Sequence, residues 1–188
     1  MIKRLIIKLL WTIGRHLRIH LINKSLLELN YYNLKKSQKY KDPKNLINYG
    51  FKVYSQSDED GIINEIFKRI GIKKKFFIEF GLQDGKECNT AFLLKSGWNG
   101  SWVDMSTNVK QLNIDFKKFI NKNLKFYKYK ILKSNVNEII QKCSNENKEI
   151  DLLSIDIGIN TYHVLNEIIL NPRVIVTEYN AKLRDEVE

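Results

Sequence analysis

Four short apolar runs that each reach an acidic residue alternate with helix-like segments along most of the chain. The acids at the ends of these runs are Glu79, Asp104, Asp156 and Glu178. Unbroken apolar runs are typical of parallel strands that are covered on both faces. Alternating strands and helices in turn favour a parallel sheet with right-handed crossovers. The sequence therefore predicts an α/β fold built on a Rossmann-like doubly wound, mostly parallel sheet.

The individual elements are placed by apolar periodicity and by turn residues. Strands are expected at 76–80, 101–104, 124–130, 151–157 and 173–179, and helices at 58–70, 90–96, 107–120, 136–143 and 161–170. The first of these helices has Ser57 or Asp58 as its cap, Gly71 at its end, and a buried stripe of Ile62, Ile63, Ile66, Phe67 and Ile70. In the helix at 107–120 the residues expected to face inward are Val109, Leu112, Phe116 and Phe119.

The turn after the first strand, FGLQDGKECNT, has the features of a ligand-binding loop. Gly81 and Gly85 let the chain turn tightly and bring backbone N–H groups close to a ligand above the strand end. Asp104 lies 19 residues beyond Gly85. An acid about 20 positions after such a loop binds ribose hydroxyls in doubly wound folds. These positions suggest an adenosine-containing ligand; the alternative is an ordinary strand, turn and helix with solvated acids.

The class of ligand is narrowed by motifs that this loop lacks. Neither a G-x-G-x-x-G fingerprint nor a P-loop is present in the sequence, so a dinucleotide or a nucleoside triphosphate is disfavoured. An acid before the turn, Asp-Gly inside it and an acid on the next strand resemble a class I S-adenosylmethionine-dependent methyltransferase. That cofactor has no phosphates, and its positive sulfonium and amino groups favour an acidic rim. Gln56, Glu59 or Asp60 either lies over the ligand or only complements the dipole of its helix.

Several segments in matching order resemble the FkbM-type methyltransferases, in particular a branch found beside sugar and polysaccharide biosynthesis functions. The segments are SQSDEDGIINEIFKRIG, FFIEFGLQDGKECNT, LLKSGWNGSWVDMS, DLLSIDI and RVIVTEYNA. The resemblance implies a Rossmann-like fold. It also implies transfer of a methyl group from S-adenosylmethionine to a hydroxyl oxygen of a sugar or polysaccharide-related acceptor.

By position, the resemblance assigns a cofactor loop and a reaction site. The cofactor-binding residues would be Glu79, Gly81, Asp84, Gly85, Asn89, Asp104 and Ser106, the last two at the ribose end. Asp156 would border the methyl-transfer site as the catalytic carboxylate that draws the proton from the acceptor hydroxyl. Alignment of that oxygen with the sulfonium methyl would supply much of the remaining barrier reduction.

Departures from the family pattern leave a second hypothesis open. Gln83 stands where relatives usually have a small residue, and Cys88 stands where they often have Asn. Residues 158–161 read GINT, without the carboxylates that relatives tend to have there. The chain ends at Glu188, where this class normally continues, so a C-terminally truncated domain is expected. The alternative function is therefore a catalytically inactive or truncated methyltransferase-fold protein that acts as a binding or membrane-surface accessory module.

Positive charge is concentrated in the first 50 residues. They contain 11 Lys or Arg and two acids, a net charge of +9 out of +11 for the whole chain. The remainder is nearly neutral, which disfavours a nucleic-acid groove across the main domain. The chain is therefore divided into a basic amphipathic helix and linker at 1–50 and a Rossmann-like methyltransferase domain at 51–188.

Residues 1–30 are predicted to form one amphipathic helix, and 31–49 a linker. The longest uncharged run of the helix, at 9–14, is too short to span a bilayer. The helix either lies at an anionic lipid surface, with Trp11 near the headgroups, or docks on its own domain or on a second subunit. His16 and His20 have the i, i+4 spacing of two metal ligands, but no third ligand accompanies them. A basic helix face is the preferred interpretation, and no metal is expected.

The cysteine content and the charge distribution limit where the protein is located and which partners it binds. Cys88 and Cys143 make neither a metal motif nor a disulfide framework, which indicates a reducing compartment. The expected location is the cytoplasm, with peripheral contact at the inner face of the membrane if residues 1–30 bind lipid. The expected partner is a small-molecule or glycan acceptor, with no nucleic acid. The sequence does not define the oligomeric state.

Overall fold

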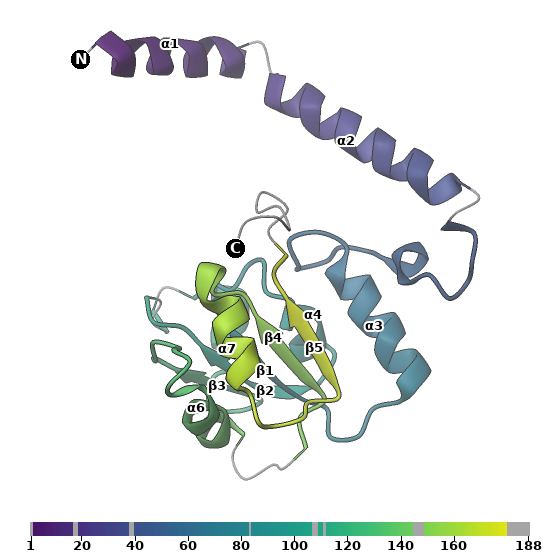
Figure 1. Cartoon of the computed structure of the whole chain (residues 1–188), viewed down its shortest axis with the longest axis vertical. Coiled ribbons are helices and arrows are strands. Elements are labelled where there is room, and N and C mark those ends of the chain that lie inside the picture. The colour runs from purple at the N-terminus through teal and green to yellow at the C-terminus, as the bar shows by residue number, and fades with distance from the viewer. Residues whose placement is uncertain are drawn as a thin grey trace. The chain divides into compact units, whose positions relative to one another are not determined.

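The computed structural model describes residues 2–16, 19–37, 40–82, 84–106, 109–110, 112–144 and 149–179 (Figure 1). The chain divides into two compact units, Met1–Asn48 and Tyr49–Glu188. The first unit is helical, and the second contains the sheet.

Two helices make up most of the described part of the first unit. They are α1 at Ile2–His16 and α2 at Ile19–Lys36, and a short 3-10 helix, η2, follows at Leu46–Tyr49. The expected linker at 31–49 is wrong over residues 31–36, which belong to α2. Stacked i, i+4 pairs stabilise this part of the helix: the ammonium of Lys35 lies 4.7 Å from the ring centroid of Tyr31, and that of Lys36 lies 4.1 Å from Tyr32. Among the described residues, no helix is both long enough and apolar enough to cross a membrane.

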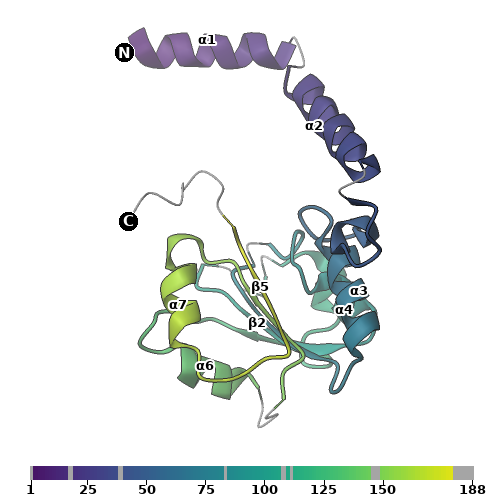
Figure 2. The ribbon, with the colours of Figure 1, turned by 45° about the vertical axis from the view of Figure 1, so that its right-hand side comes forward.

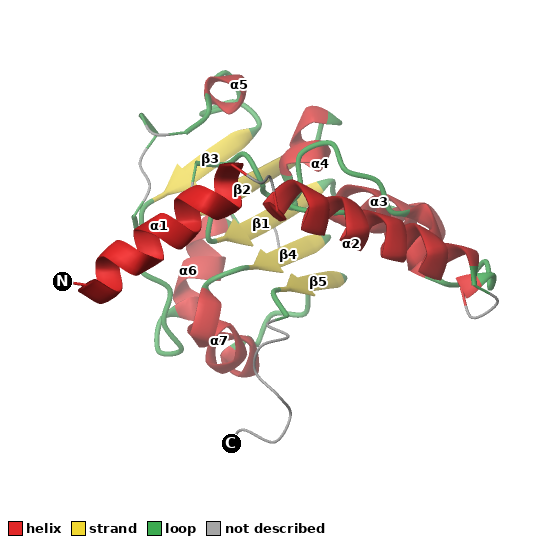
Figure 3. Cartoon of the chain, turned by 90° about the horizontal axis from the view of Figure 1, so that it is seen from above, coloured by secondary structure: helices red, strands yellow, loops and turns green. Residues whose placement is uncertain are grey.

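The second unit is built on a five-stranded, wholly parallel sheet in the order β3-β2-β1-β4-β5 (Figure 3). The strands are β1 (Phe76–Phe80), β2 (Asn99–Val103), β3 (Leu124–Tyr127), β4 (Leu152–Ile155) and β5 (Val174–Thr177). The predicted α/β fold with a parallel sheet is confirmed. The strand order reverses between β1 and β4, and open α/β sheets bind ligands beyond the carboxyl ends of the strands at such a point.

Helices cover both faces of the sheet and give three layers (Figure 2). The helices of the sheet unit are α3 (Glu59–Ile70), α4 (Ala91–Lys95), α5 (Ile114–Lys117), α6 (Val136–Cys143) and α7 (Thr161–Glu167), with a 3-10 turn, η3, at Gly158–Asn160. One apolar cluster joins α3, α4 and α5 to the face that carries Phe77 and Trp102. A second cluster joins α6 and α7 to the face that carries Ile78 and Leu153. The central strands β1 and β4 are thus buried on both sides, as expected of parallel strands, whereas the edge strands β3 and β5 are partly exposed.

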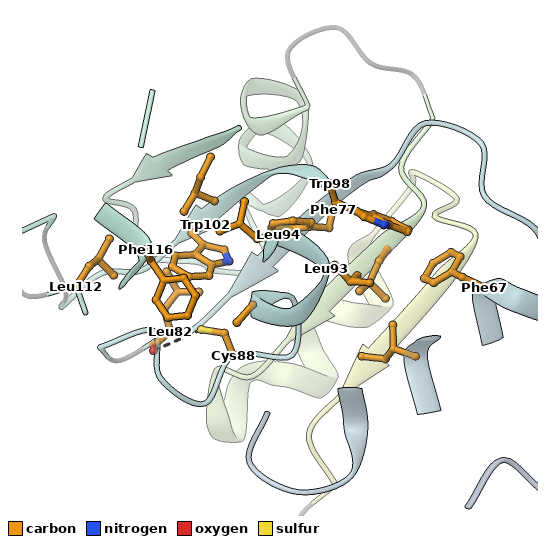
Figure 4. Close-up of a cluster of buried hydrophobic side chains, with 14 residues drawn as sticks. Phe67, Phe77, Leu82, Cys88, Leu93, Leu94, Trp98, Trp102, Leu112 and Phe116 are labelled. Atoms are coloured by element: carbon orange, nitrogen blue, oxygen red, sulfur yellow. Dashed lines mark hydrogen bonds between the residues drawn. The ribbon is translucent and has the colours of Figure 1, made fainter. Parts of the chain in front are cut away.

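The first cluster places aromatic rings directly beneath the candidate ligand loop (Figure 4). The Trp102 ring meets the Phe116 ring edge-on, with 5.3 Å between centroids. The thiol of Cys88 is buried nearby and donates to the carbonyl of Leu82 at 3.8 Å. The loop therefore rests on a well-packed apolar layer.

The helix expected at 107–120 is wrong for most of its length, because α5 covers only Ile114–Lys117. Asn113 has an extended backbone and accepts the N–H of Asp115 at 3.0 Å, so it caps a helix that begins after it. Its own N–H donates to the carbonyl of Asp84 at 3.0 Å. Residues 107, 108 and 111 lie outside the described residues. The apolar spacing was correct for Leu112 and Phe116, which are buried, whereas Val109 is exposed.

The helix expected at 58–70 is confirmed as α3, and Gly71 ends it with a φ of 75°. Two details differ. Asp58 makes no side-chain capping bond, and the N–H of Asp60 donates to the hydroxyl of Ser55 at 3.1 Å instead. Ile70, expected in the buried stripe, is exposed at the last position of the helix, and its backbone carbonyl accepts a hydrogen bond from the guanidinium of Arg173.

Candidate functional site at the carboxyl ends of the strands

The four acids of the strand ends lie at one edge of the sheet. Glu79 is the next-to-last residue of β1, and Asp104, Asp156 and Glu178 directly follow β2, β4 and β5. Because neighbouring strands are parallel and paired in register, their carboxyl ends meet at the same edge. The arrangement expected from the sequence is confirmed.

Two adjoining hollows lie over this edge. The large hollow has a volume of about 590 Å³ and is lined by Gln56, Glu59, Glu79, Gly81, Leu82, Asp84, Lys86, Glu87, Cys88, Asn89, Asp156 and residues 176–179. The small hollow has a volume of about 250 Å³ and is lined by Gly81, Leu82, Asp104, Met105, Ser106, residues 129–131, Asp156, Ile157 and Asn160. Both are lined by Gly81, Leu82 and Asp156. The two hollows therefore meet where the strand order reverses, between β1 and β4.

Gly81 is required at this junction by close backbone contact. Its φ is 83°, and a Cβ added to it would lie 1.7 Å from the carbonyl oxygen of Asp156. Its N–H donates to the carbonyl of Val103 at 3.0 Å. The glycine thus lets the loop after β1 pass tightly over the ends of β2 and β4.

Glu79 holds the ligand loop in place from below. One carboxylate oxygen accepts the N–H of Asn89 at 2.9 Å and the hydroxyl of Ser154 at 3.3 Å. The other accepts the N–H and the hydroxyl of Thr90. Burial raises the pKa of Glu79 to about 7, although the hydrogen bonds from Thr90, Asn89 and Ser154 act in the opposite direction. Glu79 lines the large hollow, but its hydrogen bonds make it a positioning residue.

The hydrogen bonds continue from Glu79 into the neighbouring strands. The amide of Asn89 donates to the hydroxyl of Ser154 on β4 at 3.1 Å. The indole N–H of Trp102 on β2 donates to the hydroxyl of Thr90 at 2.8 Å. The loop after β1 is thereby tied to both strands that flank β1.

Asp104 and Ser106, the predicted ribose-binding pair, line the small hollow. One carboxylate oxygen of Asp104 accepts the N–H of Leu82 at 2.9 Å. The other accepts the N–H of Ser106 at 2.7 Å and its hydroxyl at 2.8 Å. Asp104 therefore also fixes the loop after β1 to the end of β2, a role that spacing alone did not indicate.

Asp84 and Gly85 have different roles in the same loop. The carboxylate of Asp84 pairs with the ammonium of Lys86 at 2.8 Å, and hydrogen bonds from Lys86 lower the pKa of that carboxyl. Gly85 has a φ of 82°, and a Cβ there would lie 3.2 Å from the Trp102 ring. It lines neither hollow, so its contribution is the turn itself. Gln83 lies outside the described residues.

Asp156 lies at the junction, where a proton acceptor could reach either hollow. Loss of solvation at the end of β4, together with hydrogen bonding to and repulsion from the Glu178 carboxylate, raises the pKa of Asp156 to about 6. A carboxylate with a pKa near the working pH suits general base catalysis.

The large hollow is strongly acidic, although the chain as a whole has a net charge of +11. Six of its lining residues are acids: Glu59, Glu79, Asp84, Glu87, Asp156 and Glu178. Lys86 is the basic residue among them, and it is paired with Asp84. A cationic ligand group is therefore favoured over an anionic one.

Gln56 and the first residues of α3 have separate roles. Gln56 and Glu59 line the large hollow, which supports the interpretation that they lie over a ligand. Asp60 is buried, and its carboxylate accepts the N–H groups of residues 53–55 at 2.6–3.0 Å. Asp60 therefore supports the turn and does not reach the hollow.

Sequence reasoning missed part of the lining. Lys86, Glu87 and Tyr179 belong to the large hollow, and Tyr129, Lys130 and Ile131 belong to the small one. Residues 129–131 follow the end of β3, so the rule that led to the four acids could have identified them. Within the described residues, no group of three or more His, Cys, Asp or Glu could hold a metal ion. The side chains of His16 and His20 lie outside the description.

Comparisons of the chain with protein-family models, with curated proteins and with solved structures found no match. The class of protein is therefore defined by the fold and the candidate site alone. The second unit is an α/β protein with a Rossmann-like parallel sheet, and its larger hollow has the volume of a small-molecule site.

Proposed function

We propose that the protein is an S-adenosylmethionine-dependent methyltransferase that acts on a hydroxyl group of a sugar or polysaccharide-related acceptor. The observation that carries this proposal is the pair of hollows that meet at Gly81, Leu82 and Asp156, at the reversal of strand order. One hollow can take the adenosine part of the cofactor while the other takes its charged end and the acceptor.

The small hollow fits the adenosine part. Asp104 and Ser106 supply oxygen atoms for ribose hydroxyls, and Tyr129 and Ile131 supply an aromatic ring and an apolar surface for the base. An aromatic ring can stack on the adenine base, and this contact requires neither a phosphate nor a metal ion.

The large hollow fits the positive end of the cofactor. Its acids favour both the sulfonium and the amino group, because opposite charges attract strongly in a partly buried site. Asn89 adds a polar side chain on the same wall.

Asp156 then acts on the acceptor. Bound S-adenosylmethionine would supply the methyl group that the acceptor oxygen takes as it loses its proton. The hydroxyl proton passes to the Asp156 carboxylate. A positioned base of this kind contributes about 10²–10⁴-fold to the rate, and alignment of oxygen and methyl contributes the rest.

A binding module without turnover is the second candidate. Residues 158–161 contain no carboxylate, which favours this alternative. Glu178 on the neighbouring strand nevertheless supplies a second carboxyl beside Asp156, so the reaction site has two acids.

Both unpaired cysteines fit the reducing cytoplasm as the proposed location.

Calorimetric titration with S-adenosylmethionine and with its demethylated product tests the cofactor assignment. Tyr129→Ala should weaken binding by about 1–3 kcal/mol through lost stacking. Tyr162→Ala is the matched control, because Tyr162 is exposed and lines neither hollow. Absence of binding heat in the wild-type protein would refute the proposal. Binding without methyl transfer to any sugar acceptor would support the second candidate instead.

A further inference from the structure

Helix α1 exposes a continuous apolar stripe. Ile6, Leu10 and Ile13 follow i, i+4, i+7 spacing and therefore lie on one face, and they are 51%, 62% and 45% exposed. In a globular protein such a stripe normally packs on a core. Exposed contiguous apolar surface marks an interaction site.

The opposite face of α1 is basic. Arg4 and Lys8, at i, i+4 spacing, are exposed and lie about half a turn around the helix from the apolar stripe. Helix α1 contains no acidic residue. The first 50 residues have a net charge of +9, so the partner of this unit must be anionic.

We propose that α1 binds an anionic lipid surface, lying in the plane of the interface with Ile6, Leu10 and Ile13 in the acyl boundary. A lipid surface satisfies both faces at once: the stripe leaves water, and the basic side chains remain near the headgroups. A helix is only about 10–12 Å across. The charges on its far face therefore stay within about one Debye length of the headgroup charge.

A nucleic acid and a second copy of α1 fit the two faces of the helix less well than a lipid surface does. A nucleic acid would bind the basic face and leave the apolar stripe in water. A second copy of α1 would bring two helices without acids side by side, so their charges would repel. The 15 residues of α1 also supply only about two heptads, fewer than the three or four that indicate a coiled coil. At about 1.5 Å per residue the helix is shorter than the roughly 30 Å of a bilayer core, which favours an interfacial position.

Vesicle flotation of the full-length protein tests the proposal, with phosphatidylcholine vesicles that contain or lack phosphatidylserine. The wild-type protein should float only with phosphatidylserine, and high salt should release it. Arg4→Gln combined with Lys8→Gln should weaken binding about 30-fold. Lys122→Gln combined with Lys133→Gln, two exposed lysines of the sheet unit, is the charge-matched control and should bind as the wild type does.

Leu10→Gln tests the apolar stripe and should weaken binding about 10-fold or more. Its matched control is Leu27→Gln, at a leucine of α2 that is 69% exposed, which should leave binding unchanged. Circular dichroism checks that each variant keeps its helices. The proposal would be overturned if equal amounts of protein floated with vesicles that contain and that lack phosphatidylserine. It would also be overturned if the two leucine variants lost vesicle binding equally. A dimer in light scattering that Leu10→Gln dissociates would overturn it as well, because a second copy would then occupy the stripe.

Discussion

The ionisation of Glu79 is predicted to make the protein less stable as the pH rises toward 7. Burial raises the pKa of this carboxyl to about 7 from its usual 4.5, although the hydrogen bonds from Thr90, Asn89 and Ser154 favour the charged form. The folded state therefore keeps a proton that the unfolded state has already released between these two values. The stability from this proton is complete below the unfolded pKa and is lost as the pH rises through the folded pKa. One pKa unit corresponds to about 1.36 kcal/mol, so the loss is about 3 kcal/mol.

Urea unfolding followed by tryptophan fluorescence, at pH values from about 4 to about 8, measures this loss. Glu79→Gln removes the ionisation, so the free energy of unfolding of this variant should depend on pH less steeply than that of the wild type, by about 3 kcal/mol across the range. Asp156→Asn is the control, because the pKa of Asp156 is also raised, to about 6. This control should retain the Glu79 contribution. An NMR titration of the wild-type carboxyl gives the pKa directly, without any variant.

The same pH slope in the wild type and in Glu79→Gln would refute the reasoning. It would mean that four donated hydrogen bonds hold Glu79 ionised in spite of its burial. A carboxyl pKa below the usual value in the NMR titration would lead to the same conclusion.

Three further predictions concern the sheet and the site. Asp151→Ala should lower the free energy of unfolding by about 3–5 kcal/mol in urea, because the buried carboxylate accepts the N–H groups of residues 73–75 and pairs with Arg173 at 2.8 Å; a loss under about 1 kcal/mol would contradict this account. Asp156→Asn should lower the methyl-transfer rate about 10²–10⁴-fold, while calorimetry shows that cofactor binding is retained. The wild-type rate should rise with pH through about 6. An unchanged rate in Asp156→Asn would show that Asp156 is not the base. Gly81→Ala should abolish cofactor binding and lower the melting temperature, because its Cβ would overlap the carbonyl of Asp156; a variant as stable as the wild type that binds cofactor normally would contradict the junction described here.

The sheet and the placement of the acids could be predicted because both follow from local pattern. Apolar runs define buried parallel strands, and parallel strands bring their carboxyl ends together whatever the details of the crossovers. Glu79, Asp104, Asp156 and Glu178 therefore reach one edge even though the strands at 151–157 and 173–179 proved shorter than expected.

The errors arose where tertiary contacts or single side chains override periodicity. Asn113 caps α5 and delays its start, although the apolar spacing continues through the preceding turn. Asp60 has the position of a helix-dipole residue, yet its carboxylate binds the backbone of residues 53–55. The stacked Lys35 and Lys36 extend α2 through a polar segment that composition describes as a linker.

The roles of the individual site residues could not be predicted from a sequence pattern either. Spacing predicted that Asp104 is a ribose ligand, but its hydrogen bond to the N–H of Leu82 depends on two loops that follow different strands. Tyr129 lines the small hollow only because β3 lies beside β2, and that neighbour relation requires the strand order.

A structure of the protein bound to the demethylated cofactor product tests the central claim most directly. We expect adenosine in the small hollow, between Asp104 and Tyr129, and the sulfur at the junction beside Gly81 and Asp156. Ligand bound away from the carboxyl ends of β1, β2 and β4, or no bound ligand at saturating concentration, would contradict it.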